Sequence, residues 1–330
     1  MSKVKFTSKK SHGFIPYSKL NKSITIQRFL LLYDEFLEDK KLEGLAKRTI
    51  TDYKNHLEFL KKYIDSIEKP EKENMLIDTE FFKRYVYYMS MEKEYQPATI
   101  NIRLTTLKCY CNWLFKKEYT AQNYTLILKK VRVPEDTIQP LSNADVRKML
   151  SMPNRGTYAG MRDFSIMVVI LDCGIRINEL CETLITDIDL KEKILHVRGE
   201  VSKTRKGRDL PLSKQSIFLL KQLIDISIEN NCNYVFMSSN TADKVSKDVI
   251  TKNFENYGKK AGLKVRCTPH IFRHTFCTNA VKAGVDLFTI QKLMGHQCLQ
   301  TTRKYVQLNI QDIIKNHNKV NFVSRYFGGK

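Results

Sequence analysis

The sequence of 330 residues holds 56 lysines and arginines against 35 aspartates and glutamates, which gives a formal net charge of +21 at neutral pH. A hydrophobic fraction of 42% is enough for roughly two domain cores, whereas 13 glycines and 8 prolines are too few for a collagen-like or low-complexity chain. The longest aliphatic run, Ile166–Leu171, is far shorter than the ~20 residues of a membrane span, and both halves of the chain are basic, so we expect nucleic acid and no membrane as the partner.

Residues 1–23 are predicted to form a flexible basic arm. They hold six lysines and no acidic residue, and Gly13 and Pro16 interrupt any helical period. No apolar run or small-residue cleavage site follows, so nothing marks the chain for secretion. Eight cysteines without the spacing of a disulfide framework fit reduced thiols. We therefore expect a cytoplasmic protein.

Residues 24–118 are predicted to form a small helical domain. Apolar side chains recur at spacings of three and four along four segments, which are 24–37, 49–64, 81–89 and 99–115. We expect these four helices to enclose a core that includes Trp113, the only tryptophan. Residues 119–140 are predicted to be a linker, because their second half has two prolines, strong charge and no period.

Residues 141–308 are predicted to form a second domain that is mostly helical. Its expected helices are 142–150, 163–172, a short one from Asn178, 249–261, 269–283 and 287–294. The segments 194–197 and 208–212 flank a polar stretch and predict the two strands of a hairpin, and residues 234–236 predict another short strand. The fold class expected for the whole chain is mainly α with a small antiparallel β-sheet.

Four short motifs in the second domain carry side chains suited to phosphate chemistry. In chain order they are Gly174-Ile-Arg176-Ile-Asn-Glu179, Lys203-Thr204, His270-Ile-Phe-Arg273-His274, and Gly295-His296 with Tyr305 nine residues on. Their order and contexts resemble the tyrosine site-specific recombinases, also called phage-integrase-type recombinases. The resemblance is loose over the helical domain and close over residues 141–308. It implies an N-terminal helical core-DNA-binding domain, a catalytic domain and, at 309–330, an oligomerisation tail.

The two arginines of these motifs suit the cleavage of a phosphodiester. Attack on phosphorus places negative charge on the non-bridging oxygens, and guanidinium groups neutralise that charge most effectively. Arg176 and Arg273 are the candidates. His270 lies three residues before Arg273 on a predicted helix, so both side chains can reach one phosphate. His274 lies on an adjacent face and is expected to be structural.

The resemblance assigns the remaining roles. Tyr305 is the expected nucleophile, and its phenol, with a pKa of about 10, needs a positive field and a base to lose its proton. His270 is the expected base, His296 a hydrogen-bond donor to the phosphate, and Lys203 the general acid for the departing 5′ oxygen. Lys206 is the alternative general acid. No cofactor is expected, since one ester replaces another and the sequence holds no ATP-binding or metal-carboxylate motif.

Some of these residues also admit plainer interpretations. Cys267, His270, His274 and Cys277 could suggest zinc, but Cys277 lies nearly two helical turns from His270, too far to share a tetrahedral site with Cys267. Arg176 could simply pair with Glu179, and we expect that contact in either case. Asp187 and Asp189 are expected to form turns.

The resemblance implies a site-specific DNA recombinase that works through a 3′-phosphotyrosyl intermediate. Its expected partners are double-stranded DNA, three further copies of the chain in a homotetramer on two duplexes, and accessory DNA-bending proteins. Residues 310–320, which have a helical period, are expected to dock on a neighbouring protomer. Integration or excision of a mobile element is the favoured role. The alternatives are Xer-like resolution of chromosome or plasmid dimers, a type IB topoisomerase, and a DNA-binding protein without catalysis.

Overall fold

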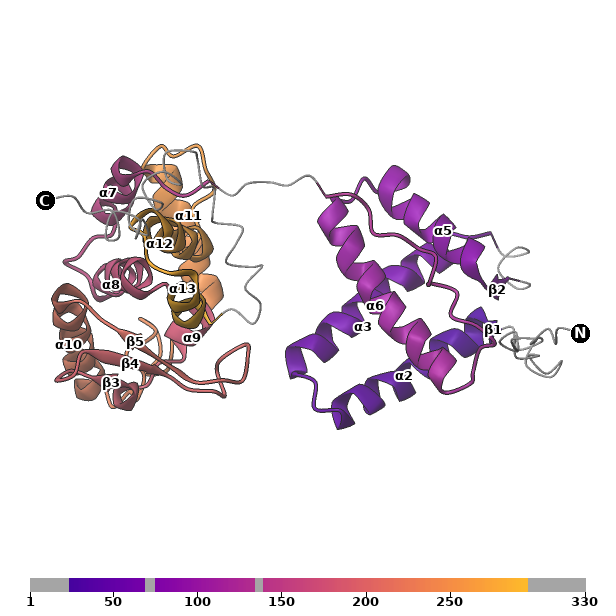
Figure 1. The fold of residues 1–330 in the computed structure, drawn as a ribbon, viewed down its shortest axis with the longest axis horizontal. Coiled ribbons are helices and arrows are strands. Elements are labelled where there is room, and N and C mark those ends of the chain that lie inside the picture. The colour runs from indigo at the N-terminus through magenta and orange to yellow at the C-terminus, as the bar shows by residue number, and fades with distance from the viewer. Residues whose placement is uncertain (1–23, 69–74, 134–138, 296–330) are drawn as a thin grey trace, which may run out of the picture. The chain divides into compact units, whose positions relative to one another are not determined.

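The protein divides into two compact units, Met1–Asp136 and Thr137–Lys330 (Figure 1). The computed structural model describes residues 24–68, 75–133 and 139–295. The predicted basic arm and the tail at 309–330 lie outside the described residues, as do His296 and Tyr305.

The first unit contains the four helices that the apolar spacing predicts. Its elements are β1 (Ile24–Thr25), α2 (Ile26–Leu42), α3 (Lys47–Asp65), β2 (Leu76–Ile77), α5 (Thr79–Tyr87), the π-helix η1 (Tyr88–Glu92) and α6 (Pro97–Lys116). The sequence analysis missed the antiparallel pair β1–β2, in which Ile24 lies opposite Ile77. Two residues per strand are too few to show an alternating pattern.

Side-chain caps and aromatic packing explain these helices. Asp78 accepts a hydrogen bond from the backbone of Phe81 at the start of α5, and Pro97 occupies the first turn of α6, where it costs no hydrogen bond. Trp113 is 5% exposed, which confirms its predicted place in the core. Its indole Nε1 donates to Asp39 at 2.8 Å, so the ring is buried without leaving its polar atom unpaired.

The second unit is mostly helical with a three-stranded antiparallel sheet of order β3-β4-β5. Its elements are α7 (Asn143–Ser151), α8 (Tyr158–Cys173), α9 (Ile177–Cys181), η2 (Ile185–Asp187), β3 (Ile188–Asp189), β4 (Ile194–Val197), β5 (Arg208–Pro211), α10 (Lys214–Glu229), α11 (Lys247–Lys260), α12 (Pro269–Lys282) and α13 (Leu287–Met294). The predicted hairpin is present as β4 and β5, with Leu195 opposite Leu210. The predicted fold class, mainly α with a small antiparallel sheet, is thus confirmed.

Three details of this unit differ from the sequence analysis. Helix α10 was not predicted, although Ser213 caps it and Leu220, Leu223 and Ile224 are buried along one side. Residues 234–236 form no strand, because only an isolated bridge joins Tyr234 to Leu184. Strand β3 was also missed, since Asp189 was expected only to form a turn.

Asp189 does form that turn, and it also belongs to a strand. Its carboxylate accepts hydrogen bonds from the backbone of Lys191 and Glu192 at 2.9 and 2.8 Å. Its backbone pairs with Ile194 of β4. One residue thus ends β3 and starts the connection to β4.

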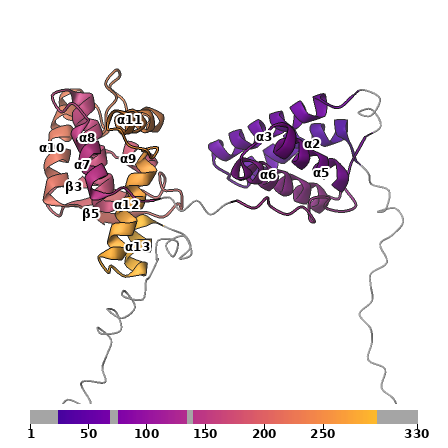
Figure 2. The ribbon, with the colours of Figure 1, turned by 90° about the horizontal axis from the view of Figure 1, so that it is seen from above.

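Helix α8 is the centre of the second core. Ile166, Val169 and Ile170 are fully buried, and α8 packs between α10 and α12 (Figures 1 and 2). Apolar residues around most of its surface are typical of such a buried helix. None of the described helices, α8 included, is long and apolar enough to span a bilayer.

A glycine ends α8 and brings the chain close to the candidate site. Gly174 has a φ of +66°, a conformation that favours glycine. A Cβ at this position would lie 2.3 Å from Phe276 Cδ1 and 2.9 Å from the sulfur of Met294. Gly174 therefore satisfies both a backbone and a packing requirement.

We predict that Gly174→Ala destabilises the protein more than Gly262→Ala does. Gly262 has the same φ of +66° but open space around its Cα, so alanine there carries only the backbone strain of about 1 kcal/mol. At Gly174 the clash adds about 2 kcal/mol. Urea denaturation of both variants measures the difference, and equal unfolding free energies would contradict the packing argument.

Candidate active site

Three arginine side chains meet at the C-terminal end of α13. Arg208 Nε donates to the carbonyl of Leu293 at 2.8 Å, Arg273 to that of Met294, and Arg176 Nη2 to that of Gly295 at 2.7 Å. The last carbonyls of a helix have no partner within the helix and carry its negative dipole end. Cationic donors therefore suit this position. The three arginines come from distant parts of the sequence, at 176, 208 and 273.

Arg176 lies at the start of α9 and faces the end of α13. Its Nη1 donates to Glu179 Oε1 at 3.0 Å, and its backbone N–H donates to Glu179 Oε2 at 3.2 Å. The expected ion pair between these residues is therefore present. The Arg176 side chain is 22% exposed, and its contacts with Glu179 and Gly295 fix the plane of the guanidinium.

Arg273 lies on α12 and is buried, with 4% exposure. Besides Met294 it donates to the carbonyl of Gly174, two residues before Arg176. Arg273 thus joins the end of α8 to the end of α13. Arg176 connects the same two segments, because it lies two residues after Gly174 and donates to the carbonyl of Gly295.

His270 lies one helical turn before Arg273, at the exposed start of α12. The pKa of its imidazole is lowered, first by desolvation and then by the positive charges of Arg273, His274 and Arg176. Because His270 and Arg273 are three residues apart on α12, they lie on the same side of that helix. A lowered pKa keeps the ring neutral at neutral pH, so it can accept a proton.

The remaining candidates are not brought to this cluster by the described part of the chain. Lys203 and its rival Lys206 are both exposed in the connection between β4 and β5, and their surroundings do not favour either one. His296 and Tyr305 lie outside the described residues. Gly295, the last described residue, immediately precedes His296 and accepts from Arg176.

The cysteines considered for zinc belong to separate packing clusters. Cys267 is buried in the main core of the unit, whereas Cys277 is buried beside Ile290 and Met294. Both are explained as small hydrophobic side chains.

Arg208, the third arginine at the end of α13, belongs to none of the four sequence motifs. Its side chain is 6% exposed and forms a two-pronged ion pair with Glu179, at 3.1 Å from Nη1 to Oε1 and 2.7 Å from Nη2 to Oε2. The available signal was the strand alternation. Arg208 is two residues from Leu210, which is buried, so both lie on the same face of β5.

Glu179 is the carboxylate that pairs with both Arg176 and Arg208. Burial raises its pKa, but hydrogen bonds and charge from Arg208, together with the charge of Arg176, more than reverse that effect, so the pKa is lowered. An ionised Glu179 between two arginines reduces their mutual repulsion. It also fixes the position of both guanidinium groups.

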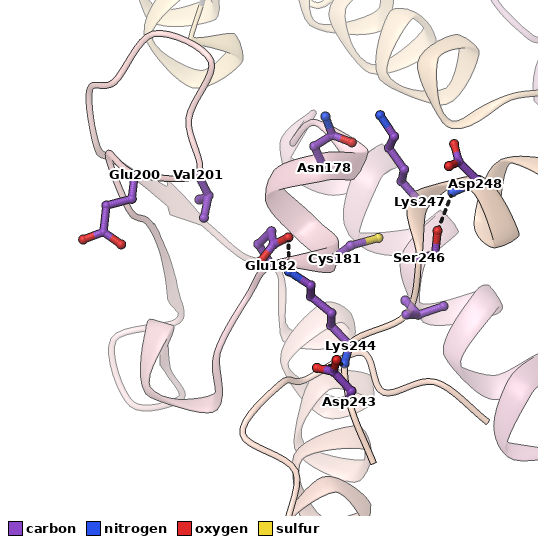
Figure 3. A pocket seen from close by; sticks show the side chains of 11 residues that line it. Asn178, Cys181, Glu182, Glu200, Val201, Asp243, Lys244, Ser246, Lys247 and Asp248 are labelled. Carbon is purple, nitrogen blue, oxygen red and sulfur yellow. Dashed lines mark hydrogen bonds and ion pairs between the residues drawn. The ribbon is translucent and has the colours of Figure 1, made fainter. Parts of the chain in front are cut away.

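Figure 3 shows a pocket of about 630 Å³ that is lined in part by α9. Its lining includes Asn178 and Cys181 of α9, and Lys244, whose ammonium lies 2.5 Å from Glu182. Four carboxylates line it against two lysines; they are Glu182, Glu200, Asp243 and Asp248 against Lys244 and Lys247. An excess of carboxylates does not favour a phosphate, so the arginine cluster remains the candidate site.

Comparison with known proteins gives a family match for each of the two units. The family model described as "Phage integrase family" matches residues 139–312, and "Phage integrase SAM-like domain" matches residues 28–131. Tyrosine recombinase XerA of Pyrococcus horikoshii is 29% identical over 301 residues, which cover 90% of this chain and 96% of that protein.

Solved structures share the fold. The Tn1549 transposon integrase in complex with circular intermediate DNA aligns with a TM-score of 0.71 at 19% identity, over 88% of this chain and 99% of that one. The XerH site-specific recombinase bound to difH substrate aligns with a TM-score of 0.66 at 20% identity, over 91% and 86%. At these identities the likeness concerns the fold.

We predict that Glu179→Gln makes stability less sensitive to acid. Because the pKa of Glu179 is lowered from its ordinary value of 4.5, its ionised form stabilises the fold above that pH, and the contribution disappears as pH falls through the folded-state pKa. Urea midpoints between about pH 5 and about pH 3 should fall more steeply for the wild type than for the variant.

The matched control for this measurement is Glu200→Gln. Glu200 has a side chain that is 86% exposed, so its replacement should keep the acid sensitivity of the wild type. If Glu179→Gln kept the same sensitivity, Glu179 would not be held ionised by the arginines.

Proposed function

The chain belongs to the phage integrase family, whose model covers more than half of it, and we propose that Tyr305 is the nucleophile with which it cuts DNA. Tyrosine recombinases cleave and rejoin DNA, and this chain is one of them. The observation that carries the proposal is the convergence of Arg176 and Arg273 on the last carbonyls of α13, with His270 one helical turn before Arg273 on α12. Only nine residues separate that end, Gly295, from Tyr305.

The proposed reaction is an exchange of esters at phosphorus. The Tyr305 oxygen attacks, the bond from phosphorus to the 5′ oxygen breaks, and a 3′-phosphotyrosyl bond forms. The phenol proton goes to His270, and the 5′ oxygen takes a proton from Lys203. Attack by the 5′ hydroxyl of a partner strand reverses these transfers, so the bond energy is conserved and no cofactor is consumed.

Arg176 and Arg273 are proposed to bind the scissile phosphate. In the transition state their charge stabilises the non-bridging oxygens, and their fixed contacts mean that little reorganisation is needed. His296 would add a further hydrogen bond to the phosphate. The neutral ring of His270 matches its role as the proton acceptor.

The proposed partner is double-stranded DNA. A net charge of +21 favours a polyanion, and the Tn1549 integrase and XerH structures are complexes with DNA. Exchange between two duplexes needs four active sites, so we infer a homotetramer, with accessory DNA-bending proteins as further partners.

We favour integration or excision of a mobile element as the role, as the sequence analysis did. Xer-like dimer resolution is the second candidate, because relatives named XerA and XerC align over most of this chain. The experiment below separates these roles, because the DNA site that the protein selects can be located either at the ends of a mobile element or in the chromosome outside one.

We predict that the protein forms a covalent DNA adduct that depends on Tyr305. The full chain is incubated with a pool of nicked duplexes of randomised sequence, in which the cut strand loses its 5′ end and cannot be rejoined. Adducts that survive detergent are isolated and sequenced. Tyr305→Phe should abolish them, whereas Tyr87→Phe, at a tyrosine that is 60% exposed, should form them as the wild type does.

Other outcomes would assign the remaining alternatives. DNA binding without any adduct would identify a non-catalytic binding protein. Relaxation of supercoiled plasmid by a monomer without a preferred sequence would identify a type IB topoisomerase. An adduct that persists in Tyr305→Phe would remove Tyr305 as the nucleophile.

We predict that the rate of adduct formation falls in acid because His270 becomes protonated. Its pKa is below the ordinary value of 6.5, so the ring is neutral at pH 7 and gains a proton as pH falls through the lowered pKa. His270→Gln should be slower by about 100-fold or more and should lose this dependence. His196→Gln, at a solvent-exposed histidine of β4, should keep it.

A further inference from the structure

Arg208 contacts both α9 and α13 within the arginine cluster, although it is not one of the proposed phosphate ligands. Through Nη1 and Nη2 it holds both carboxylate oxygens of Glu179, and through Nε it holds the carbonyl of Leu293. Glu179 in turn holds Arg176. A single planar group on β5 thus connects α9 to the last turn of α13.

The space around Arg208 is closely filled. A Cβ on Gly295 would lie 3.0 Å from Arg176 Nη1 and 3.1 Å from Arg208 Cζ. Gly295 therefore lies against both guanidinium groups and, with a φ of +61°, ends α13 there.

We propose that Arg208 is a positioning residue for DNA cleavage, which acts by fixing Arg176 through Glu179 and the end of α13 through Leu293. This inference rests on the proposed function. Three donors in a fixed plane are needed for these contacts, and a lysine supplies one nitrogen on a flexible chain. Charge alone is therefore not sufficient. Misplacement by about 1 Å lowers the rate of a positioned reaction by about 100-fold.

The test compares Arg208→Lys and Arg208→Ala with Arg198→Ala in the full chain. Arg198 lies next to β4 and donates to Asp187 and to the carbonyl of Glu182. Arg198→Ala therefore removes the same charge as Arg208→Ala but none of the contacts of the arginine cluster. The probe is the nicked duplex that the wild type selects from the randomised pool. DNA affinity, the single-turnover rate of adduct formation at saturating DNA and the melting temperature are measured for each.

Both Arg208 variants should form the adduct about 100-fold more slowly, with DNA affinity close to that of Arg198→Ala. Arg198→Ala should cleave near the wild-type rate. Added guanidinium ion should restore part of the rate of Arg208→Ala, and sodium chloride at equal ionic strength should not. The proposal would be overturned if Arg208→Lys cleaved at the wild-type rate. It would also be overturned if the Arg208 variants lost rate only in proportion to a loss of DNA affinity or of melting temperature.

A double variant keeps the test decisive if Arg208→Ala does not fold. The variant that combines Arg208→Lys with Glu179→Gln removes the buried carboxylate that would otherwise lose its guanidinium partner. If Arg208 acts through Glu179, the double variant should cleave about as fast as the slower single variant, and additive losses would overturn the proposal. Absence of an adduct in the wild type is a different result, because it contradicts the proposed function itself.

Discussion

The carbonyl groups at the end of α13 are the constraint on which the second unit depends. Leu293, Met294 and Gly295 each accept a hydrogen bond from a different arginine, so β5, α12 and the start of α9 must all reach one helix end. Unpaired carbonyls would carry a desolvation cost there. The contacts that complete a helix therefore also determine where the positive charge of the site lies.

Three guanidinium groups so close together repel one another, and the fold offsets this in two ways. Glu179 contributes a buried negative charge that pairs with Arg176 and Arg208, and the dipole of α13 contributes a further negative potential. Arg273 has carbonyl dipoles as its described hydrogen-bond partners. Arg176 and Arg208 share one carboxylate, so this pair keeps a net positive charge that is complementary to a phosphate.

The sequence predicts those elements whose signals are local. Gly174, Pro269 and Asp286 mark helix ends that the structure contains, and Arg176, His270 and Arg273 were found through their motifs. Arg208 belongs to no motif, and the only local signal for it is the strand alternation that places it on the same face of β5 as buried Leu210. Helix α10 carries a helical spacing that lies just after a hairpin, where strand signals dominated. The structure does not distinguish Lys203, the preferred general acid, from Lys206, because both are exposed in one polar connection.

The contacts that stabilise this unit are also those that position the proposed catalytic arginines, and this limits how the site can vary. Removing Glu179 would leave Arg208 buried beside Arg176 without a counter-charge, so the change affects the fold as well as the site. The first half of α8 has a buried ion pair of its own, between Arg162 and Asp163, and Asp163 also accepts a hydrogen bond from Asn253 of α11. The arginine cluster tolerates only changes that keep both its charge balance and its planar contacts.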